Sequence, residues 1–431
     1  MTAHPTQVSE AFAAVAADHR RCFWLDGGGA REWSGRRSVL GWLAEDDVSL
    51  SYSAARREVR RHVGAASEVV GEDVFQVLSA ELAAGSATDQ WFGYLGYACR
   101  PDLPARPSVD VPDAVWMRPS HVRLFDHPPD GLPGTGSLML TGTATRANTR
   151  DTRSAGYPDG APPPAYRTAF DRVQEQLRRG NSYEVNLTER HVVASDLAPA
   201  AAYLRLRELN PAPYAGFLQH DVPGATGWLL SSSPERYALV GADRSIETKP
   251  IKGTTPRGRD ERSDDELRRR LGVDPKYRAE NLMIVDLLRN DLAVVCEPGS
   301  VAVPALMQVE SYETVHQLVS TVRGRLRDDV DTVGALRSLF PAGSMTGAPK
   351  LRTMEIIDAV EATPRGAYAG AFGWVSADGR ADLGVVIRSL TTTGDGTYRL
   401  GTGGGITVLS DVEEEHAEAQ LKAERLLRVF D

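Results

Sequence analysis

The order of elements in the second half of the chain constrains the fold most. From residue 167 onward, short apolar segments typical of β-strands occur in pairs joined by short turns, and helical patterns lie between the pairs. Such pairs indicate antiparallel sheets, whereas a doubly wound sheet needs a long crossover between its parallel strands. We therefore predict an α+β fold in which antiparallel sheets pack together and helices lie on the outside.

Individual segments support this prediction. Helical spacing in YRTAFDRVQEQLRRG ends at Gly180, and the chain closes with the helical segment DVEEEHAEAQLKAERLLRVF. A long amphipathic helix is expected within DELRRRLGVDPKYRAENLMIVDLLRNDLAVV. Residues 367–408, which are rich in apolar and small residues, predict three strands.

The first 147 residues mix strand-like and helical segments more loosely. SLMLTGTAT, at residues 137–145, predicts a strand, and the polar stretch that follows is rich in Pro and Gly. We expect a linker over 148–166 between an N-terminal portion, 1–147, and a catalytic region, 167–431. The length of 431 residues provides core for two or three domains.

The composition is that of a soluble globular protein and excludes several partners. A formal net charge of −9 argues against nucleic acid or an anionic membrane. The N-terminal residues show no export signal, and no apolar run approaches the roughly 20 residues of a membrane span. Cys22, Cys99 and Cys296 are far apart and lack metal-ligand spacing, which predicts structural thiols in a reducing cytoplasm.

Two acidic segments could hold a divalent cation. Glu280 begins an apolar helical stretch, and Glu415 and Glu418 are three residues apart on one helix face. Carboxylates from two helices could bind Mg²⁺, which completes its shell with water and an anionic substrate. The alternative for the second segment alone is a solvated acidic face.

A glycine-rich segment could hold an anion. The backbone N–H groups of GTGGGI, Gly401–Ile406, can approach a carboxylate closely. Arg388 could add a bidentate contact and Tyr368 a hydroxyl. The alternative for the glycines taken alone is that they are turns and sheet-packing sites. The segment FPAGSMTGAPK is not a phosphate loop, because its glycines are too close together and Ala-Pro separates the last glycine from its lysine.

Lys252 lies between an aliphatic residue and a glycine in the segment ETKPIKGTTPRG. A lysine becomes a nucleophile when burial or a neighbouring cation lowers its pKa. Glu235, upstream in SSSPERY, could carry protons to a leaving oxygen. The alternative for Lys252 alone is a solvated loop lysine.

Together these motifs resemble those of the chorismate-utilising enzymes, which include anthranilate, aminodeoxychorismate, isochorismate and salicylate synthases. The resemblance covers residues 165–431 densely and the first part of the chain more loosely, through FWLDG, WFGYLGY and LFDH. The matching motifs, in order, are SSSPERY, PIKGT, AENLMIVDLLRNDL, VHQLVSTVRG, FPAGSMTGAPK, RGAYAGAFGW, GGGIT and the spaced residues Glu415, Glu418 and Lys422.

The resemblance implies a chemistry centred on Lys252. Anthranilate synthases usually have alanine at this position, whereas the aminodeoxychorismate synthases have lysine, as here. That lysine is taken to attack C2 of chorismate as the C4 hydroxyl leaves; ammonia then attacks C4 and expels the lysine, which gives 4-amino-4-deoxychorismate. Glu235 matches the proton donor and acceptor for the hydroxyl. Glu280 and Glu418 match Mg²⁺ ligands, with Glu415 reaching the ion through water.

The resemblance also implies a set of substrate contacts. They are Tyr368, Arg388, the backbone of Gly403 and Gly405, Thr346, Gly347 and Lys422.

Three positions depart from the family pattern. Tyr277 replaces a frequent glutamate, which thins the outer metal shell. Gln317 stands where pyruvate-eliminating members have histidine, with His316 one place earlier, which weakens the anthranilate alternative. Glu184 stands where ammonia-using members often have glutamine and water-using members have lysine, which argues against isochorismate synthase.

The ammonia is expected to come from a partner. None of the three cysteines lies in an amidotransferase motif, so a separate glutamine amidotransferase subunit is implied. The product could serve para-aminobenzoate and folate synthesis or a secondary metabolite such as an antibiotic. Anthranilate synthase component I is the enzymatic alternative, and a non-catalytic regulatory homologue is the alternative from another class.

Overall fold

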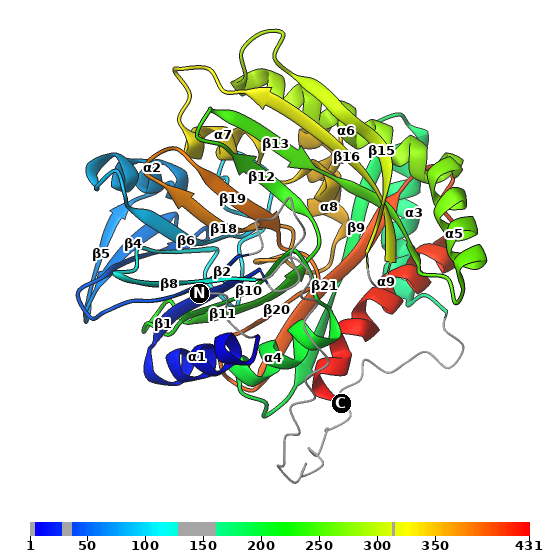
Figure 1. Cartoon of the computed structure of the whole chain (residues 1–431). Helices are drawn as coiled ribbons and strands as arrows, with labels where there is room; N and C mark the ends of the chain where they lie inside the picture. The colour runs from blue at the N-terminus through cyan, green and yellow to red at the C-terminus, as the bar shows by residue number, and fades with distance from the viewer. Residues whose placement is uncertain (1–4, 28–36, 128–160, 313–314) are drawn as a thin grey trace.

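The computed structural model describes residues 5–27, 37–127, 161–312 and 315–431, which form two antiparallel sheets covered by helices (Figure 1). In spatial order, the first sheet contains β17 (Gly347–Ala348), β9 (Glu184–Ala194), β21 (Thr397–Ile406), β20 (Ser389–Thr392), β11 (Gly227–Ser233), β10 (Tyr214–His220), β1 (Arg21–Asp26), β2 (Arg37–Trp42) and β8 (His121–Asp126). These pairings confirm the predicted antiparallel α+β fold.

The second sheet is larger and includes one strand off its main path. In order it contains β14 (Ile251–Pro256), β16 (Val315–Arg325), β13 (Ser245–Lys249), β12 (Arg236–Val240), β19 (Ala381–Val385), β18 (Ala371–Ser376), β6 (Gln90–Leu95), β7 (Ala114–Met117), β3 (Val48–Ser53), β4 (Glu58–Val63) and β5 (Ala66–Gly71), and β15 (Ala302–Ser311) pairs with β16.

Helices cover the outer faces of the sheets. They are α1 (Pro5–Asp18), α2 (Val74–Ala84), α3 (Pro164–Arg178), α4 (Pro199–Leu209), α5 (Glu261–Val273), α6 (Pro275–Val295), α7 (Thr332–Leu339), α8 (Lys350–Val360) and α9 (Val412–Leu427), with 3₁₀ turns at Gly343–Met345 and Arg428–Phe430. None of the helices in the described ranges is long and apolar enough to cross a membrane.

The prediction of three strands in residues 367–408 is wrong, because four are present. The chain leaves the second sheet after β19 and, after three intervening residues, enters the first sheet at β20. Arg388, at this crossing, has a φ of 49°, a left-handed conformation that is uncommon outside glycine. The run LGVVI is apolar throughout, so its sequence does not mark the end of β19.

The first part of the chain contributes strands to both sheets. β1 pairs with β10, and β6 pairs with β18. The strand predicted at 137–145 and most of the predicted linker, 148–160, lie outside the described residues. Helix α3 begins at Pro164, so the last predicted linker residues are helical. The division at 147 stays a prediction.

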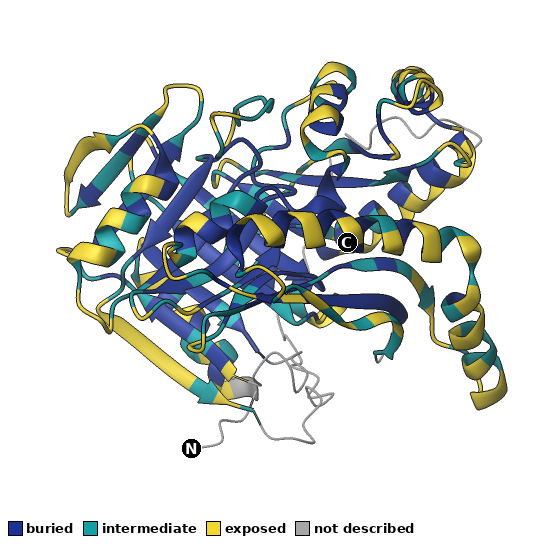
Figure 2. Ribbon diagram, turned by 90° about the horizontal axis from the view of Figure 1, so that it is seen from above, coloured by how far each residue is buried: buried dark blue, intermediate teal, exposed yellow. Residues whose placement is uncertain are grey.

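Apolar side chains from both sheets fill the space between them. The ring of Phe23 on β1 stacks on that of Phe92 on β6 with centroids 4.1 Å apart, and Leu218, Leu229 and Phe372 belong to the same buried cluster. Figure 2 shows the buried strands at the centre and the exposed residues mainly on helices and outer strands. Burial of this kind contributes about 25 cal/mol per Å² of apolar surface.

Helix α6 carries Glu280 into the interior. The side chain of Asp274 caps its first turn by accepting two backbone N–H groups, and Pro275 occupies the first helical position. Ile284 and Leu288, one turn apart, are buried on the face that packs against the second sheet. Glu280 lies one turn before Ile284, so the same face brings its carboxylate inward.

Candidate active site

Residues of both sheets, α6 and α9 line a cavity of about 530 Å³. This volume lies within the range of small-molecule sites. Ten of the twelve site residues predicted from the sequence line it: Glu235, Lys252, Glu280, Tyr368, Arg388, Gly403, Gly405, Glu415, Glu418 and Lys422.

A β-bulge directs Lys252 into the cavity. The pairing of β14 with β16 runs from Ile251 opposite Val319 to Thr254 opposite Gln317, so β14 carries one extra residue. Gly253 occupies the bulge with a φ of 92°, a conformation that glycine adopts without strain. The glycine that follows Lys252 in the sequence thus permits the bulge that turns the lysine side chain toward the cavity at the edge of the sheet.

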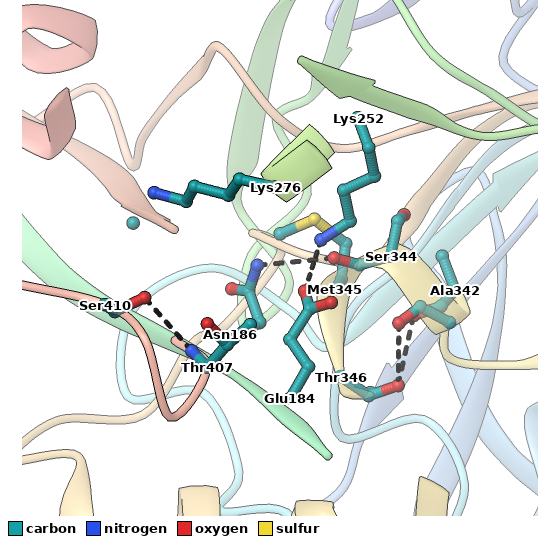
Figure 3. Close-up of polar contacts among 12 residues, drawn as sticks. Glu184, Asn186, Lys252, Lys276, Ala342, Ser344, Met345, Thr346, Thr407 and Ser410 are labelled. Carbon is teal, nitrogen blue, oxygen red and sulfur yellow. Dashed lines mark hydrogen bonds and ion pairs between the residues drawn. The ribbon is translucent and has the colours of Figure 1, made fainter. Parts of the chain in front are cut away.

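The Lys252 ammonium forms a buried ion pair with Glu184 at the start of β9 (Figure 3). The pair joins the second sheet to the first. A Cβ on Gly405 would lie 2.1 Å from Glu184 Oε1 and 3.0 Å from Lys252 Nζ, so this glycine leaves the space that the pair occupies. Burial lowers the pKa of Lys252, but the carboxylates of Glu184 and Glu280 outweigh it, and the pKa is raised above its usual value. Burial alone therefore does not produce a neutral amine.

Glu235 lies on the cavity wall between β11 and β12. Burial raises the pKa of its carboxyl to about 7, although a hydrogen bond from Ser344 and the charges of Lys252 and Arg388 lower it. The Ser344 hydroxyl donates to Glu235 Oε1 over 2.6 Å. A carboxyl with this pKa is partly protonated near neutral pH, so it can give a proton to a leaving group.

The glycine-rich segment is a strand rather than a separate loop. In β21, Gly403 pairs with Thr188 of β9 and Gly405 with Asn186. The backbone N–H of Thr188 donates to Glu361, and that of Asn186 donates to the Thr346 carbonyl. Both N–H groups therefore point away from β21. Gly403 and Gly405 therefore direct their own peptide groups away from β9.

The edge of β21 beside these glycines faces the cavity. The pairing of β20 with β21 involves Arg399 and Leu400 and ends before Gly403. The Gly403 carbonyl accepts a hydrogen bond from Lys422 Nζ over 2.9 Å. The two glycine N–H groups on this edge are positioned to bind an anion.

Arg388 and Tyr368 complete the polar wall on this side. No hydrogen bond of the Arg388 guanidinium is found within the described residues, and burial lowers its pKa to about 10, so it remains a cation near neutral pH. The Tyr368 ring lies 5.3 Å from the Arg190 guanidinium, a cation–π contact that holds the ring in place.

Three carboxylates, those of Glu280, Glu415 and Glu418, also line the cavity. Lys276 Nζ donates to Glu415 Oε1 over 2.9 Å, and Lys422 Nζ lies 2.8 Å from Glu418 Oε1. Glu280 Oε1 is buried without a hydrogen-bond partner among the described residues, and burial raises the pKa of this carboxyl to about 7.

These carboxylates fit a divalent cation by their chemistry. As placed, no group of three His, Cys, Asp or Glu side chains in the described parts of the chain is close enough to hold a metal. Glu280 Oε1 nevertheless has no hydrogen-bond donor among the described residues, and the carboxylates of Glu415 and Glu418 each contact a lysine ammonium group that a cation could replace. Hard carboxylate oxygens are the ligands that Mg²⁺ prefers.

Two predicted contact residues, Thr346 and Gly347, are not among the residues that line the cavity. The Thr346 hydroxyl hydrogen-bonds to the Gly343 carbonyl within its own turn, and Gly347 pairs with Val185 in β17. Both residues shape the turn that places Ser344, so the structure gives no support for direct contacts with a substrate.

Several residues of the site were not singled out from the sequence. Ser344 lies inside the motif FPAGSMTGAPK, but no role was assigned to it. No sequence pattern marked Asn186 or Lys276 as site residues. Glu184 was recognised as a departure from the family, but its partner was not predicted. The pairing of Glu184 with Lys252 spans 68 residues, so only the fold reveals it.

The fold and the cavity define a chorismate binding enzyme, and the comparisons agree. The chain matches this family over residues 20–428 and belongs to it. Aminodeoxychorismate synthase of Streptomyces pristinaespiralis is 40% identical over 97% of this chain, and that of Streptomyces griseus is 38% identical over 95%. The chain spans 63% and 61% of the lengths of these two relatives.

A shorter relative and a solved structure extend the comparison. Aminodeoxychorismate synthase component 1 of Escherichia coli (strain K12) is 42% identical over 62% of this chain and 57% of that protein. The crystal structure of anthranilate synthase component I from Streptococcus pneumoniae TIGR4 has a TM-score of 0.72 and 24% identity, covering 91% of this chain and 92% of that one. That likeness shows the shared fold.

Proposed function

We propose that this protein converts chorismate and ammonia to 4-amino-4-deoxychorismate. The observation that carries the proposal is the buried Lys252 amine, which a β-bulge directs into the same cavity as Glu235. The two Streptomyces relatives, which carry the name aminodeoxychorismate synthase, support it. Anthranilate synthesis is disfavoured because those enzymes usually have alanine at the lysine position.

The lysine acts as a covalent catalyst that divides one substitution into two. The Lys252 amine attacks C2 of chorismate, the ring double bond shifts, and the C4–O bond breaks. Glu235 gives its proton to the departing hydroxyl, which leaves as water. Ammonia then attacks C4, the double bond shifts back, and the C2–N bond breaks to release Lys252. Glu235 accepts the proton that the new ammonium group loses.

Other polar groups of the cavity hold the anionic substrate. Arg388 can bind a carboxylate through two N–H groups, and the N–H groups of Gly403 and Gly405 can bind the same or a second carboxylate. Glu280, Glu418 and Glu415 would hold Mg²⁺, which supplies positive charge to a substrate carboxylate when bound. Lys276 and Lys422 would then leave these carboxylates.

We further propose that a separate glutamine amidotransferase supplies the ammonia. The "component 1" in the name of the Escherichia coli relative is consistent with a second component for that protein. Cys22, Cys99 and Cys296 are buried free thiols, and burial raises the pKa of Cys22 to about 12, which is unsuited to a thiolate nucleophile. Free thiols also support a cytoplasmic location.

Product analysis tests the proposal directly. The purified protein is incubated with chorismate, Mg²⁺ and an ammonium salt, and the products are separated and identified by mass spectrometry. We expect 4-amino-4-deoxychorismate, without release of pyruvate. Anthranilate with an equivalent of pyruvate, or isochorismate, would contradict the proposal.

A further inference from the structure

The partner of the Lys252 ammonium is fully buried. Glu184 has no exposed surface, and its Oε1 contacts Lys252 Nζ. Its second oxygen, Oε2, has no hydrogen-bond partner within the described residues. Figure 3 shows the two side chains pointing toward one another from β9 and β14. A carboxylate oxygen with spare acceptor capacity thus lies against the nitrogen that would attack the substrate.

The charges around Lys252 keep it protonated in the resting site. Carboxylates from four elements act on it: Glu184 on β9, Glu280 on α6, Glu235 before β12 and Glu418 on α9. An ammonium nitrogen has no lone pair and cannot attack carbon, so the proton must leave before the C–N bond forms. A dianionic substrate beside the lysine would stabilise the ammonium further, so bulk solvent at neutral pH is a poor proton acceptor for this step.

We infer that Glu184 is a catalytic residue that takes the proton of Lys252 as the amine attacks. The inference rests on the proposed function and assigns the base that the lysine step requires. Glu235 cannot fill this role in the same step, because it gives its proton to the leaving hydroxyl. Glu184 is the carboxylate in contact with the attacking nitrogen.

The proton movements balance over one turnover. The ammonium of Lys252 passes one proton to Glu184, and the resulting amine forms the C2–N bond while the C4 hydroxyl leaves with the proton of Glu235. Ammonia forms the C4–N bond as the C2–N bond breaks, which releases Lys252 as a neutral amine. The new C4 ammonium returns a proton to Glu235, and Glu184 returns its proton to Lys252. The sum is chorismate plus ammonia giving aminodeoxychorismate plus water.

The pH dependence of a Glu184→Gln variant tests the inference. Transfer between Lys252 and Glu184 exchanges no proton with solvent, so in the wild type this step adds no acidic limb to the pH profile. In the variant, the lysine must lose its proton to solvent. The measured quantity is the ratio of the variant's kcat to the wild-type kcat at the same pH. We expect this ratio to be about 10⁻² at pH 6 and to increase as the pH rises. A constant ratio, reduced or not, would overturn the inference.

A second variant and a labelling measurement separate charge from packing. Glu184→Asp keeps a carboxylate, so its activity ratio should be reduced but flat with pH; a ratio that rises with pH would contradict the inference. Reductive methylation of Lys252, followed by peptide mass spectrometry, should proceed at lower pH in Glu184→Gln than in the wild type. Unchanged labelling would show that Glu184 does not control the proton on this nitrogen.

A Lys252→Ala control distinguishes the inference from the proposed function. Full activity of Lys252→Ala would refute the covalent route itself. An inactive Lys252→Ala protein beside a Glu184→Gln protein with the activity of the wild type would refute the role of Glu184 alone. In the double variant, loss of Glu184 should add little to the loss of Lys252, because both act in one step.

Discussion

The Ser344 hydroxyl donates a hydrogen bond to Glu235 Oε1 over 2.6 Å, across 109 residues of sequence. The serine belongs to the 3₁₀ turn after α7, and the glutamate follows β11. This contact fixes one carboxyl oxygen and lowers its pKa, while burial raises the pKa to about 7 overall.

Activity should therefore fall as the pH rises above about 7, because Glu235 must be protonated to assist the leaving hydroxyl. Ser344→Ala removes a contact that lowers the pKa, so the descending limb of kcat/KM should move to higher pH. Steady-state rates with saturating ammonia, corrected for its own ionisation, provide the measurement. A limb that stays in place in the variant would show that another group controls it.

Stability should depend on pH through the same carboxyl. The pKa of Glu235 is raised from 4.5 to about 7 on folding, so its contribution to stability is present below pH 4.5 and lost as the pH rises through 7. The free energy of unfolding of Glu235→Gln, relative to that of the wild type, should rise by roughly 3 kcal/mol over this window. Urea titrations at pH 5 and pH 8 measure the change, and a pH-independent difference would contradict it.

Loss of Lys252 should reduce both activity and stability. Lys252→Ala should lower 4-amino-4-deoxychorismate formation by on the order of 10²–10⁴-fold, the range for a positioned catalytic group. The buried Glu184 then lacks its partner, and breaking a buried pair costs about 3–5 kcal/mol. Replacing Glu184 by Gln in the same chain should recover part of that stability without restoring activity. Mass spectrometry of the wild type should detect a substrate adduct on the Lys252 peptide.

The Mg²⁺ requirement should depend on carboxylates from two helices. Glu280→Gln and Glu418→Gln should each raise the Mg²⁺ concentration needed for half-maximal activity, because each removes a charge and a ligand. Glu414→Gln, an exposed residue on the same helix as Glu418, is the matched control and should leave the requirement unchanged. Calorimetric titration of Mg²⁺ gives a second measurement, and unaltered binding in either variant would remove that residue from the ligand set.

The isolated protein should use ammonium salts but not glutamine. Cys22, Cys99 and Cys296 are buried, and burial raises the pKa of Cys296 to about 11, so these thiols are unsuited to amide hydrolysis. Product formation is measured with glutamine as sole nitrogen source, with and without an amidotransferase subunit. Turnover of glutamine by the 431-residue chain alone would contradict the two-component proposal.

Local patterns predicted the elements well where the signal lies within a few residues. Asp274 and Pro275 mark the start of α6, and strand pairs with short turns gave the antiparallel fold. The crossing at Arg388 was missed, because a continuous apolar run satisfies either one long strand or two strands in different sheets. The linker and the division at 147 stay predictions.

The residues of the candidate site were predicted through motifs, but the contacts between them were not. Family resemblance named ten residues that line the cavity, but the contact of Glu184 with Lys252 depends on the meeting of two sheets. The raised pKa of Lys252 has the same origin, since the neighbouring carboxylates come from distant parts of the chain. Thr346 and Gly347 belong to a motif that shapes a turn and does not line the cavity.

The pairing of β1 with β10 and of β6 with β18 has a consequence for solubility. Without residues 21–127, the backbone groups of β10 and β18 that these strands occupy would be unpaired. Unpaired strand edges recruit strands of other molecules and promote aggregation. Besides supplying core residues, the first part of the chain therefore covers the edges of β10 and β18, so that these strands cannot pair with strands of other molecules.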